Sequence, residues 1–294
     1  MELWSTCREV RVLSVRVKIC GLLALLSGCS DEAYFHLLRP SASEGTGGVA
    51  GSGGISAAGG QPEMGGGEGE PPSALIHRYD FEGTGTAVLD RVGTQHGVVR
   101  GGAELEGDGA LTFDGNDDYV ALPSGLISNL EAVTLVAWLE WQGAPARCWQ
   151  RILDFGNNDS TEIDGAGNVT SSIFVTPSNC SHNVLTAVLE FVDSQDTIRA
   201  LEPLPQDESS LVALVYDETD SRFELFLNGE LVAAATPGRS LSEIDDVNNW
   251  LGRSQWIQDQ VVFLRARYLE FRIYDRGLSV DEIAELALRG PDQP

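Results

Sequence analysis

From Leu75 to about Gly290 the chain repeats one pattern: short runs of alternating apolar or β-branched residues, separated by turns of Gly, Asp and Asn. Alternation with a period of two places one face of a strand in a core. Many short strands with turns between them predict an all-β, two-sheet antiparallel jelly-roll sandwich. The clearest runs are Leu75–Phe81, Gly109–Phe113, Tyr119–Leu122, Val133–Trp141, Arg151–Phe155, Ser172–Thr176, Leu185–Val192, Thr197–Leu201, Leu211–Tyr216, Arg222–Leu227, Glu230–Ala235 and Tyr268–Tyr274.

Two local motifs sharpen this pattern. Asn228-Gly229 lies between two of the runs and predicts a tight hairpin, because both residues tolerate positive φ. A short C-terminal helix is predicted after Ser279, which forms a capping box with Glu282. The apolar face of this helix would be Ile283, Leu286 and Ala287, and the helix would stop at Gly290-Pro291.

The first 28 residues follow a different pattern. The apolar run from Ile19 to Leu26 is too short to span a bilayer, which takes about 20 residues. It ends in Leu26-Ser27-Gly28-Cys29, and four basic residues precede it: Arg8, Arg11, Arg16 and Lys18. This order predicts a signal peptide over residues 1–28.

Cys29 resembles the lipid-modified cysteine of bacterial lipoproteins. The resemblance implies an extracytoplasmic protein that is attached to a bacterial membrane through this lipid alone. Ser30 resembles the sorting residue of lipoproteins bound for the outer membrane. The alternative is an ordinary signal peptide followed by an incidental cysteine.

Residues 29–73 are predicted to be a disordered, Gly-rich tether. From Ser41 to Ser73 the chain has almost no large apolar side chain, so it cannot bury enough surface to offset the entropy of ordering. The organisation expected is therefore signal peptide, tether, a jelly-roll domain over 74–290 and a tail over 291–294.

The chain is strongly acidic, with 19 Lys plus Arg against 44 Asp plus Glu. Lys18 is its only lysine. Such a charge repels nucleic acid, which we exclude as a partner, and it favours solubility.

Five cysteines are present, and Cys7 and Cys20 fall in the signal peptide. With Cys29 assigned to the lipid, Cys148 and Cys180 remain as one pair. In an oxidising compartment these two cysteines are expected to form a disulfide, the alternative being two free thiols.

The order of several motifs resembles that of laminin-G-like domains. The matching segments are His77-Arg78-Tyr79-Asp80-Phe81-Glu82-Gly83, Val88-Leu89-Asp90, Leu111 to Val120, Val133 to Trp138, Phe226 to Leu231, Leu251-Gly252-Arg253, Phe271 to Ser279 and Glu282-Ile283. The resemblance implies a concanavalin A-like sandwich. It implies binding of glycans or proteins more than catalysis, although fold alone does not settle function.

Calcium is a candidate cofactor. Relatives often carry Asp-Glu on the last core strand, where this chain has Leu269-Glu270. The run from Asp114 to Asp118 nevertheless crowds oxygen ligands of the kind calcium prefers. The candidate ligands are Glu82, Asp90, Asp114 and Asp117; the alternative is a turn that uses its Asp and Asn side chains for local hydrogen bonds.

Catalysis is not expected. Glu162-Ile163-Asp164 resembles part of the laminarinase-like hydrolase motif, but the second glutamate of that motif is missing. Retaining glycosidases need two carboxylates about 5–5.5 Å apart.

Trp149, Trp250 and Trp256 are the candidate ligand-binding residues, because they lie among polar residues in expected loops and their rings could stack on sugars. The alternative is that each packs locally over a sheet edge. Trp138 is assigned to the core.

The function expected is an extracytoplasmic, lipid-anchored module that binds a glycan or a surface protein. A structural or adhesive envelope protein is the first alternative, and a laminarinase-like glycoside hydrolase is the second.

Overall fold

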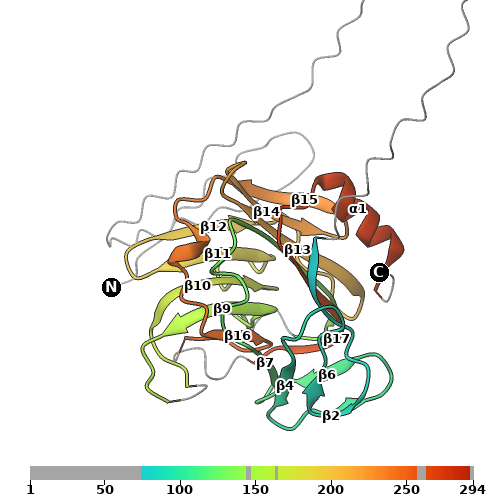
Figure 1. Ribbon diagram of the computed structural model, residues 1–294. Helices are drawn as coiled ribbons and strands as arrows, with labels where there is room; N and C mark the ends of the chain where they lie inside the picture. The colour runs from blue at the N-terminus through green and yellow to red at the C-terminus, as the bar shows by residue number, and fades with distance from the viewer. Residues whose placement is uncertain (1–73, 144–146, 163–164, 257–262, 292–294) are drawn as a thin grey trace, which may run out of the picture. The chain divides into compact units, whose positions relative to one another are not determined.

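The computed structural model describes residues 74–143, 147–162, 165–256 and 263–291. The predicted signal peptide, the lipid site at Cys29 and the predicted tether lie outside the described residues. Two antiparallel sheets pack face to face, with one α-helix against the outside of the first sheet (Figure 1). The predicted all-β sandwich with a short C-terminal helix is confirmed.

The first sheet has seven strands in the order β1-β17-β8-β13-β14-β15, with β6 also paired to β17. Their bounds are β1 Leu75–Tyr79, β6 Leu111–Asp114, β8 Ala132–Trp141, β13 Ser209–Asp217, β14 Arg222–Leu227, β15 Glu230–Ala235 and β17 Arg265–Tyr274. The first strand of the domain therefore pairs with the last.

The second sheet has eight strands in the order β12-β11-β10-β9-β16-β7-β4-β3. Their bounds are β3 Ala87–Val88, β4 Gly97–Arg100, β7 Tyr119–Leu122, β9 Leu153–Asn158, β10 Val169–Thr176, β11 Thr186–Phe191, β12 Gln195–Arg199 and β16 Asn248–Leu251. A small ribbon of β2 Thr84–Gly85 and β5 Leu105–Glu106 and the 3-10 turn η1 Leu241–Glu243 complete the strands and turns.

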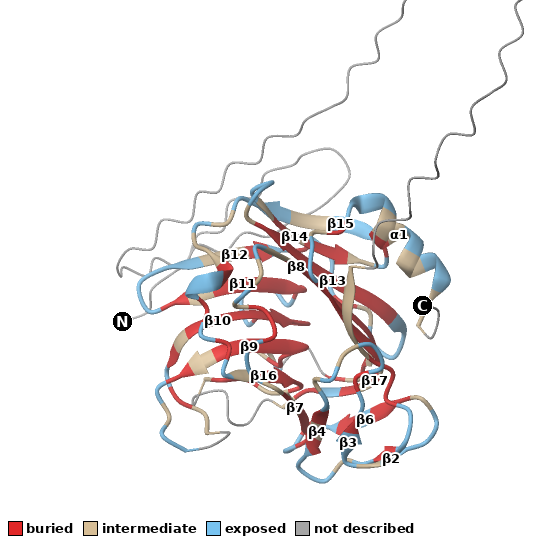
Figure 2. Ribbon diagram, in the orientation of Figure 1, coloured by how far each residue is buried: buried red, intermediate tan, exposed pale blue. Residues whose placement is uncertain are grey.

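The main core lies between the two sheets, whose strands are largely buried (Figure 2). Alternate residues of the strands contribute to it. Leu135 and Leu214 from one sheet and Phe155 and Ile173 from the other belong to this core, and all four are buried. A second apolar cluster lies on the outer face of the seven-stranded sheet. It joins Trp138, as predicted a core residue, to Ile283 of the helix.

The helix α1 spans Val280–Arg289, and the predicted capping box is confirmed. The Ser279 side chain accepts a hydrogen bond from the N–H of Glu282, and the Glu282 carboxylate accepts one from the N–H of Ser279. Gly290 ends the helix with φ +77°. Within the described residues, no helix is long and apolar enough to cross a membrane.

The predicted hairpin also forms. Asn228 and Gly229 have φ of +51° and +87°, and Leu227 pairs with Glu230 across the two-residue turn. Both positive values are what a tight hairpin turn needs to match the twist of its strands.

Glu270 follows Leu269, the residue at which the sequence departs from the Asp-Glu of laminin-G-like domains. Its carboxylate is fully buried and accepts two hydrogen bonds from Arg78, Nε to Oε1 at 2.8 Å and Nη2 to Oε2 at 3.0 Å. Arg272 donates to it as well, and its guanidinium lies 4.7 Å from the Trp138 ring. The Glu270 carboxylate is therefore the common acceptor of two arginines, Arg78 and Arg272.

Candidate functional site

The outer face of the eight-stranded sheet is covered by chain. Leu153 and Phe155 of β9 point into the core, so Asp154 between them points to the other face. The same alternation places Phe174 of β10 and Val188 of β11 on this outer face. All three outward residues are nevertheless buried, at 2% exposure or less.

The first covering segment is 147–152, which precedes β9. Arg151 lies flat over the outer face, with its guanidinium 3.9 Å from the Phe174 ring. Its Nε donates to Asp154 Oδ2 at 3.2 Å, and its Nη1 donates to the carbonyl of Trp149 at 2.6 Å. One arginine thus ties the covering segment to two strands of the sheet.

A disulfide holds this segment from its other side. Cys148 and Cys180 are joined, as predicted, with their Cα atoms 5.1 Å apart. The N–H of Trp149 donates to the carbonyl of Ser178 at 2.8 Å. Trp149 is partly exposed and its φ is +64°, a conformation that a bulky residue adopts only when its surroundings impose it.

The second covering segment is 252–256. The N–H of Gln255 donates to Asp154 Oδ2 at 3.1 Å, the same oxygen that Arg151 reaches. The indole N–H of Trp256 donates to Glu190 Oε2 on β11 at 3.1 Å. Trp256 is partly exposed, so it presents part of its ring at the surface of this cover.

The prediction that Trp250 binds a ligand from a loop is wrong. Trp250 lies on β16 and is 1% exposed, so it is not an accessible platform for a ligand. The guanidinium of Arg253 lies 4.2 Å from its ring centre, and Tyr119 meets it edge-on at 6.0 Å. The neighbouring Asn249 made this strand look like a loop, but its side-chain amide nitrogen donates to the carbonyls of Pro123 and Asp246.

Asp154 is the central titratable group of the cover. Burial raises the pKa of its carboxyl to about 6, although Arg151 and the N–H of Gln255 both favour the charged form. The negative charge of Glu190 adds to the increase. Among the described residues its Oδ1 has no hydrogen-bond partner.

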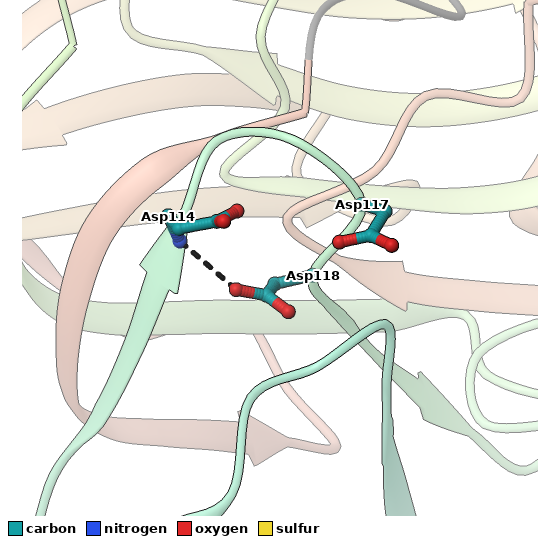
Figure 3. Close-up of side chains that lie close together, drawn as sticks. All are labelled: Asp114, Asp117 and Asp118. Carbon is teal, nitrogen blue, oxygen red and sulfur yellow. Dashed lines mark hydrogen bonds between the residues drawn. The ribbon is translucent and has the colours of Figure 1, made fainter.

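The acidic turn between β6 and β7 brings together Asp114, Asp117 and Asp118, whose carboxylate oxygens lie within 4.8 Å of one another (Figure 3). Asp118 is buried and accepts hydrogen bonds from the N–H groups of Gly102, Ala103 and Asp114 at 2.7, 2.8 and 3.0 Å. Asp118 was not among the predicted ligands, although it is the third aspartate of the run from Asp114 to Asp118.

Asp114 makes the local bonds that the turn alternative requires. Its carboxylate accepts from the backbone N–H and the side-chain amide of Asn116, and the backbone bond contributes most to lowering the pKa of this carboxyl. Asp114 and Asp117 are exposed and could still offer oxygens to a cation.

The other two predicted ligands lie elsewhere. Within the described residues, the one group of three acids that could share an ion contains neither Glu82 nor Asp90. Asp90 accepts from the N–H groups of Arg78, Val92, Gly93 and Gln95 and pairs with His77 Nδ1 at 2.7 Å. Burial alone would raise the pKa of Asp90, but these bonds outweigh it and lower the pKa. The predicted four-residue set is therefore not assembled.

Comparison with known proteins agrees with this architecture. The sequence matches the family model described as the concanavalin A-like lectin/glucanases superfamily over residues 114–284, more than half of the chain. The chain belongs to this superfamily. Among curated proteins, no sequence matches it.

Three solved structures illustrate the likeness of this concanavalin A-like domain to others. Domain 4 of an extracellular arabinanase from Geobacillus stearothermophilus, in complex with arabinotriose, is 16% identical with a TM-score of 0.57; the match covers 73% of this chain and 98% of that one. The Trypanosoma rangeli sialidase, as a covalent intermediate with 2,3-difluorosialic acid, is 16% identical with a TM-score of 0.54; the match covers 73% of this chain and 33% of the sialidase. The binding domain of botulinum neurotoxin DC, in complex with rat synaptotagmin II, is 15% identical with a TM-score of 0.54; the match covers 74% of this chain and 51% of the toxin domain. At these identities the likeness shows a common fold.

Because the superfamily includes glucanases, the position of Glu162 in this concanavalin A-like domain matters. It lies exposed in the loop between β9 and β10, where its N–H donates to Ser160 Oγ at 3.2 Å. Asp164 lies outside the described residues. Glu162 is therefore a loop residue and does not project from a strand.

Proposed function

We propose that this protein is a non-catalytic carbohydrate-binding module, displayed outside the cytoplasm by a lipid on Cys29. The observation that carries the proposal is the pair of partly exposed tryptophans, Trp149 and Trp256, on one covered sheet face. Both belong to segments tied to the same buried carboxylate, that of Asp154.

Aromatic rings recognise sugars because the apolar faces of a pyranose or furanose pack on them while hydroxyls bond at the rim. Rigid platforms lose little conformational entropy when a ligand binds. The disulfide fixes the backbone beside Trp149, and Glu190 fixes the indole of Trp256. Glu190 also places an acceptor beside the second ring for a sugar hydroxyl.

The comparisons support the same reading. The arabinanase domain, almost all of which this chain matches, was solved with an oligosaccharide, and the sialidase with a sialic acid derivative. Glycan-binding chemistry is therefore compatible with the fold, and the two tryptophans give this chain its own surface for it.

Catalysis has less support. Asp154, whose raised pKa is typical of a general acid, is fully buried beneath Arg151 and inaccessible to a glycosidic bond. Glu162 is exposed in a loop. Release of reducing sugar from a β-glucan, abolished by Glu162→Gln, would overturn the non-catalytic assignment.

A protein ligand is the second candidate. The toxin binding domain, which shares this fold, was solved with a protein receptor, synaptotagmin II. An envelope or surface protein would then be the partner, and the tryptophans would serve as apolar anchors in that interface.

A glycan array probed with the wild-type protein and with Trp149→Ala and Trp256→Ala separates these candidates. We expect retention of at least one oligosaccharide class, weakened about tenfold or more by either substitution, which corresponds to about 1.4 kcal/mol. Leu201→Ala, which removes another exposed apolar side chain, is the control. Absence of glycan binding, or binding that neither tryptophan affects, contradicts the proposal.

The anchor has a separate test. Wild-type protein expressed in a bacterium should fractionate with membranes and incorporate labelled fatty acid, whereas Cys29→Ser should do neither. Anchoring through several acyl chains is firm, since each buried methylene adds about 0.8 kcal/mol. Equal membrane recovery of the variant would refute lipidation at this cysteine.

A further inference from the structure

A cleft lies between strands of the eight-stranded sheet and the segment that follows β15. It has a volume of about 610 Å³ and is lined by residues from β9, β10 and β11 and from the segment after β15. We define the Arg239 cleft by its six principal residues, which are Asn157, Phe191, Asp193, Arg239, Glu243 and Asp245. Glu190, the partner of Trp256, faces the outside of the sheet, whereas the adjacent Phe191 faces the core, so the two sites use opposite faces of β11.

The floor of the cleft is aromatic. Phe191 is 8% exposed, and the guanidinium of Arg239 lies over its ring at 4.4 Å from the ring centre. Val192, which is 82% exposed, forms an apolar margin next to it. The cleft thus has an apolar surface beneath a planar cation, an arrangement that stabilises the cation through the ring quadrupole.

Arg239 is held in place from two sides. Its Nε donates to Glu243 Oε2 at 2.9 Å, its Nη2 lies 2.7 Å from the same oxygen, and its Nη1 donates to Asp193 Oδ1 at 2.9 Å. Its backbone carbonyl accepts from the hydroxyl of Tyr216. Because the side chain is already ordered, a ligand that binds to it loses little additional entropy.

The opposite wall is equally fixed. The side-chain amide of Asn157 donates to Asp245 Oδ2 at 2.7 Å, and the N–H of Asp245 donates to the hydroxyl of Ser171 at 3.0 Å. Strands β9 and β10 therefore set the direction of this carboxylate. The lining of the cleft thus contains both donors and acceptors.

We propose that the Arg239 cleft binds a neutral oligosaccharide. A sugar hydroxyl donates one hydrogen bond and accepts others, so it suits a wall that mixes carboxylates with guanidinium and amide N–H groups. Three carboxylates line the cleft against one guanidinium, and this excess of negative charge disfavours uronates and sialosides. The cleft is a site additional to the one under Proposed function.

Titration of the isotope-labelled protein, followed by nuclear magnetic resonance, tests this site directly. The probes are arabinotriose and cellotriose, which are neutral, and 3′-sialyllactose, which is anionic. We expect at least one neutral probe to shift the side-chain N–H resonances of Arg239 and Asn157 saturably. The sialoside at equal concentration should leave these resonances unshifted.

Three variants locate the effect. Arg239→Ala should weaken binding at this cleft about tenfold or more, whereas Trp256→Ala should leave the cleft resonances responsive. Arg289→Ala removes an arginine from a comparable exposed ion pair on α1 and is the matched control. Thermal unfolding of each variant verifies that it folds.

The proposal is overturned if no neutral probe shifts these resonances, if Arg239→Ala responds like the wild type, or if the sialoside binds equally well. Because the readout is local, loss of the tryptophan site leaves the test of this cleft intact, and the reverse also holds.

Discussion

Arg151 and Asp154 form an ion pair that is almost completely withdrawn from solvent, with side chains 1% and 0% exposed and Nε 3.2 Å from Oδ2. The pair lies on the outer face of the eight-stranded sheet, the face that points away from the other sheet. It joins both covering segments, since Gln255 donates to the same oxygen. The surface that carries Trp149 and Trp256 therefore depends on one buried carboxylate.

Breaking this pair is expected to be costly. Arg151→Ala leaves the carboxylate of Asp154 without its counter-ion, and loss of one partner from a buried pair destabilises by about 3–5 kcal/mol. Urea unfolding measures the change. Arg289→Ala, which breaks an exposed pair with Glu285, should cost at most about 1 kcal/mol. Equal costs for the two variants would contradict the role given to Arg151.

Titration of Asp154 should contribute to the pH dependence of the free energy of unfolding. Its pKa is raised from 3.8 to about 6 on folding, so the native state holds this proton more tightly than the unfolded chain. The resulting stability is fully present below pH 3.8 and is lost as the pH rises through 6. Wild-type stability relative to Asp154→Asn should therefore decline across this window in unfolding measured at several pH values. A constant difference would show that the carboxyl stays charged.

Removal of the disulfide should destabilise the domain and disturb Trp149. Cys148 and Cys180 are separated by 32 positions, and closing a loop of this size contributes about 3–4 kcal/mol in the chain-entropy model. Replacing both cysteines by serine should lower the free energy of unfolding by this amount and weaken glycan binding. A reducing agent should reproduce the loss of stability in the wild type and have no effect on the double variant. If the fully reduced wild type keeps its stability, the disulfide does not stabilise the domain.

The calcium hypothesis makes a prediction about melting temperature. An ion bound only by the native state raises its stability, so added calcium should raise the melting temperature above that measured with a chelator. Asp117→Asn should abolish the increase, since this exposed carboxylate has no assigned part in the hydrogen bonds of the turn described above. A melting temperature that calcium leaves unchanged removes the site and leaves Asp114 and Asp118 as turn-forming residues.

The cap of α1 provides a test of local stability. Ser279→Ala removes the acceptor for the N–H of Glu282 and should cost about 1 kcal/mol, whereas Ser279→Asp keeps an acceptor and should cost less. Chemical unfolding of the two variants supplies the comparison. Equal losses would indicate that α1 is held by the packing of Ile283 alone.

Features that depend on neighbouring residues were predictable from the sequence. The Asn228-Gly229 hairpin and the Ser279 capping box each depend on residues a few positions apart, and both form as expected. Most of the longer strands were found because their inward residues alternate. Strands β2, β3 and β5 were missed, since two residues hold too few alternations to recognise. The four-residue strands β4 and β16 were missed too, and β16 begins with two asparagines that are typical of a loop, whereas β6 and β7 of the same length were predicted.

The site was less predictable because it is built by contacts distant in sequence. Trp250 looked like a loop residue, but Tyr119 of another strand and Arg253 bury it. Nothing local indicates that Arg151 and Gln255 meet at Asp154. The acidic turn shows the same limit, because Asp118 is fixed by the N–H groups of Gly102 and Ala103 from an earlier loop.

The pairing of β1 with β17 has a mechanical consequence. Leu75 pairs with Tyr274, the carbonyl of Ala74 accepts from the N–H of Asp275, and the Arg78 side chain is clamped to Glu270 on the same pair of strands. Tension that enters the domain through residue 74 is thus borne first by this ladder and its ion pair. The protein therefore meets a pull at its N-terminal side with an edge strand that is paired along its length to the last strand of the domain.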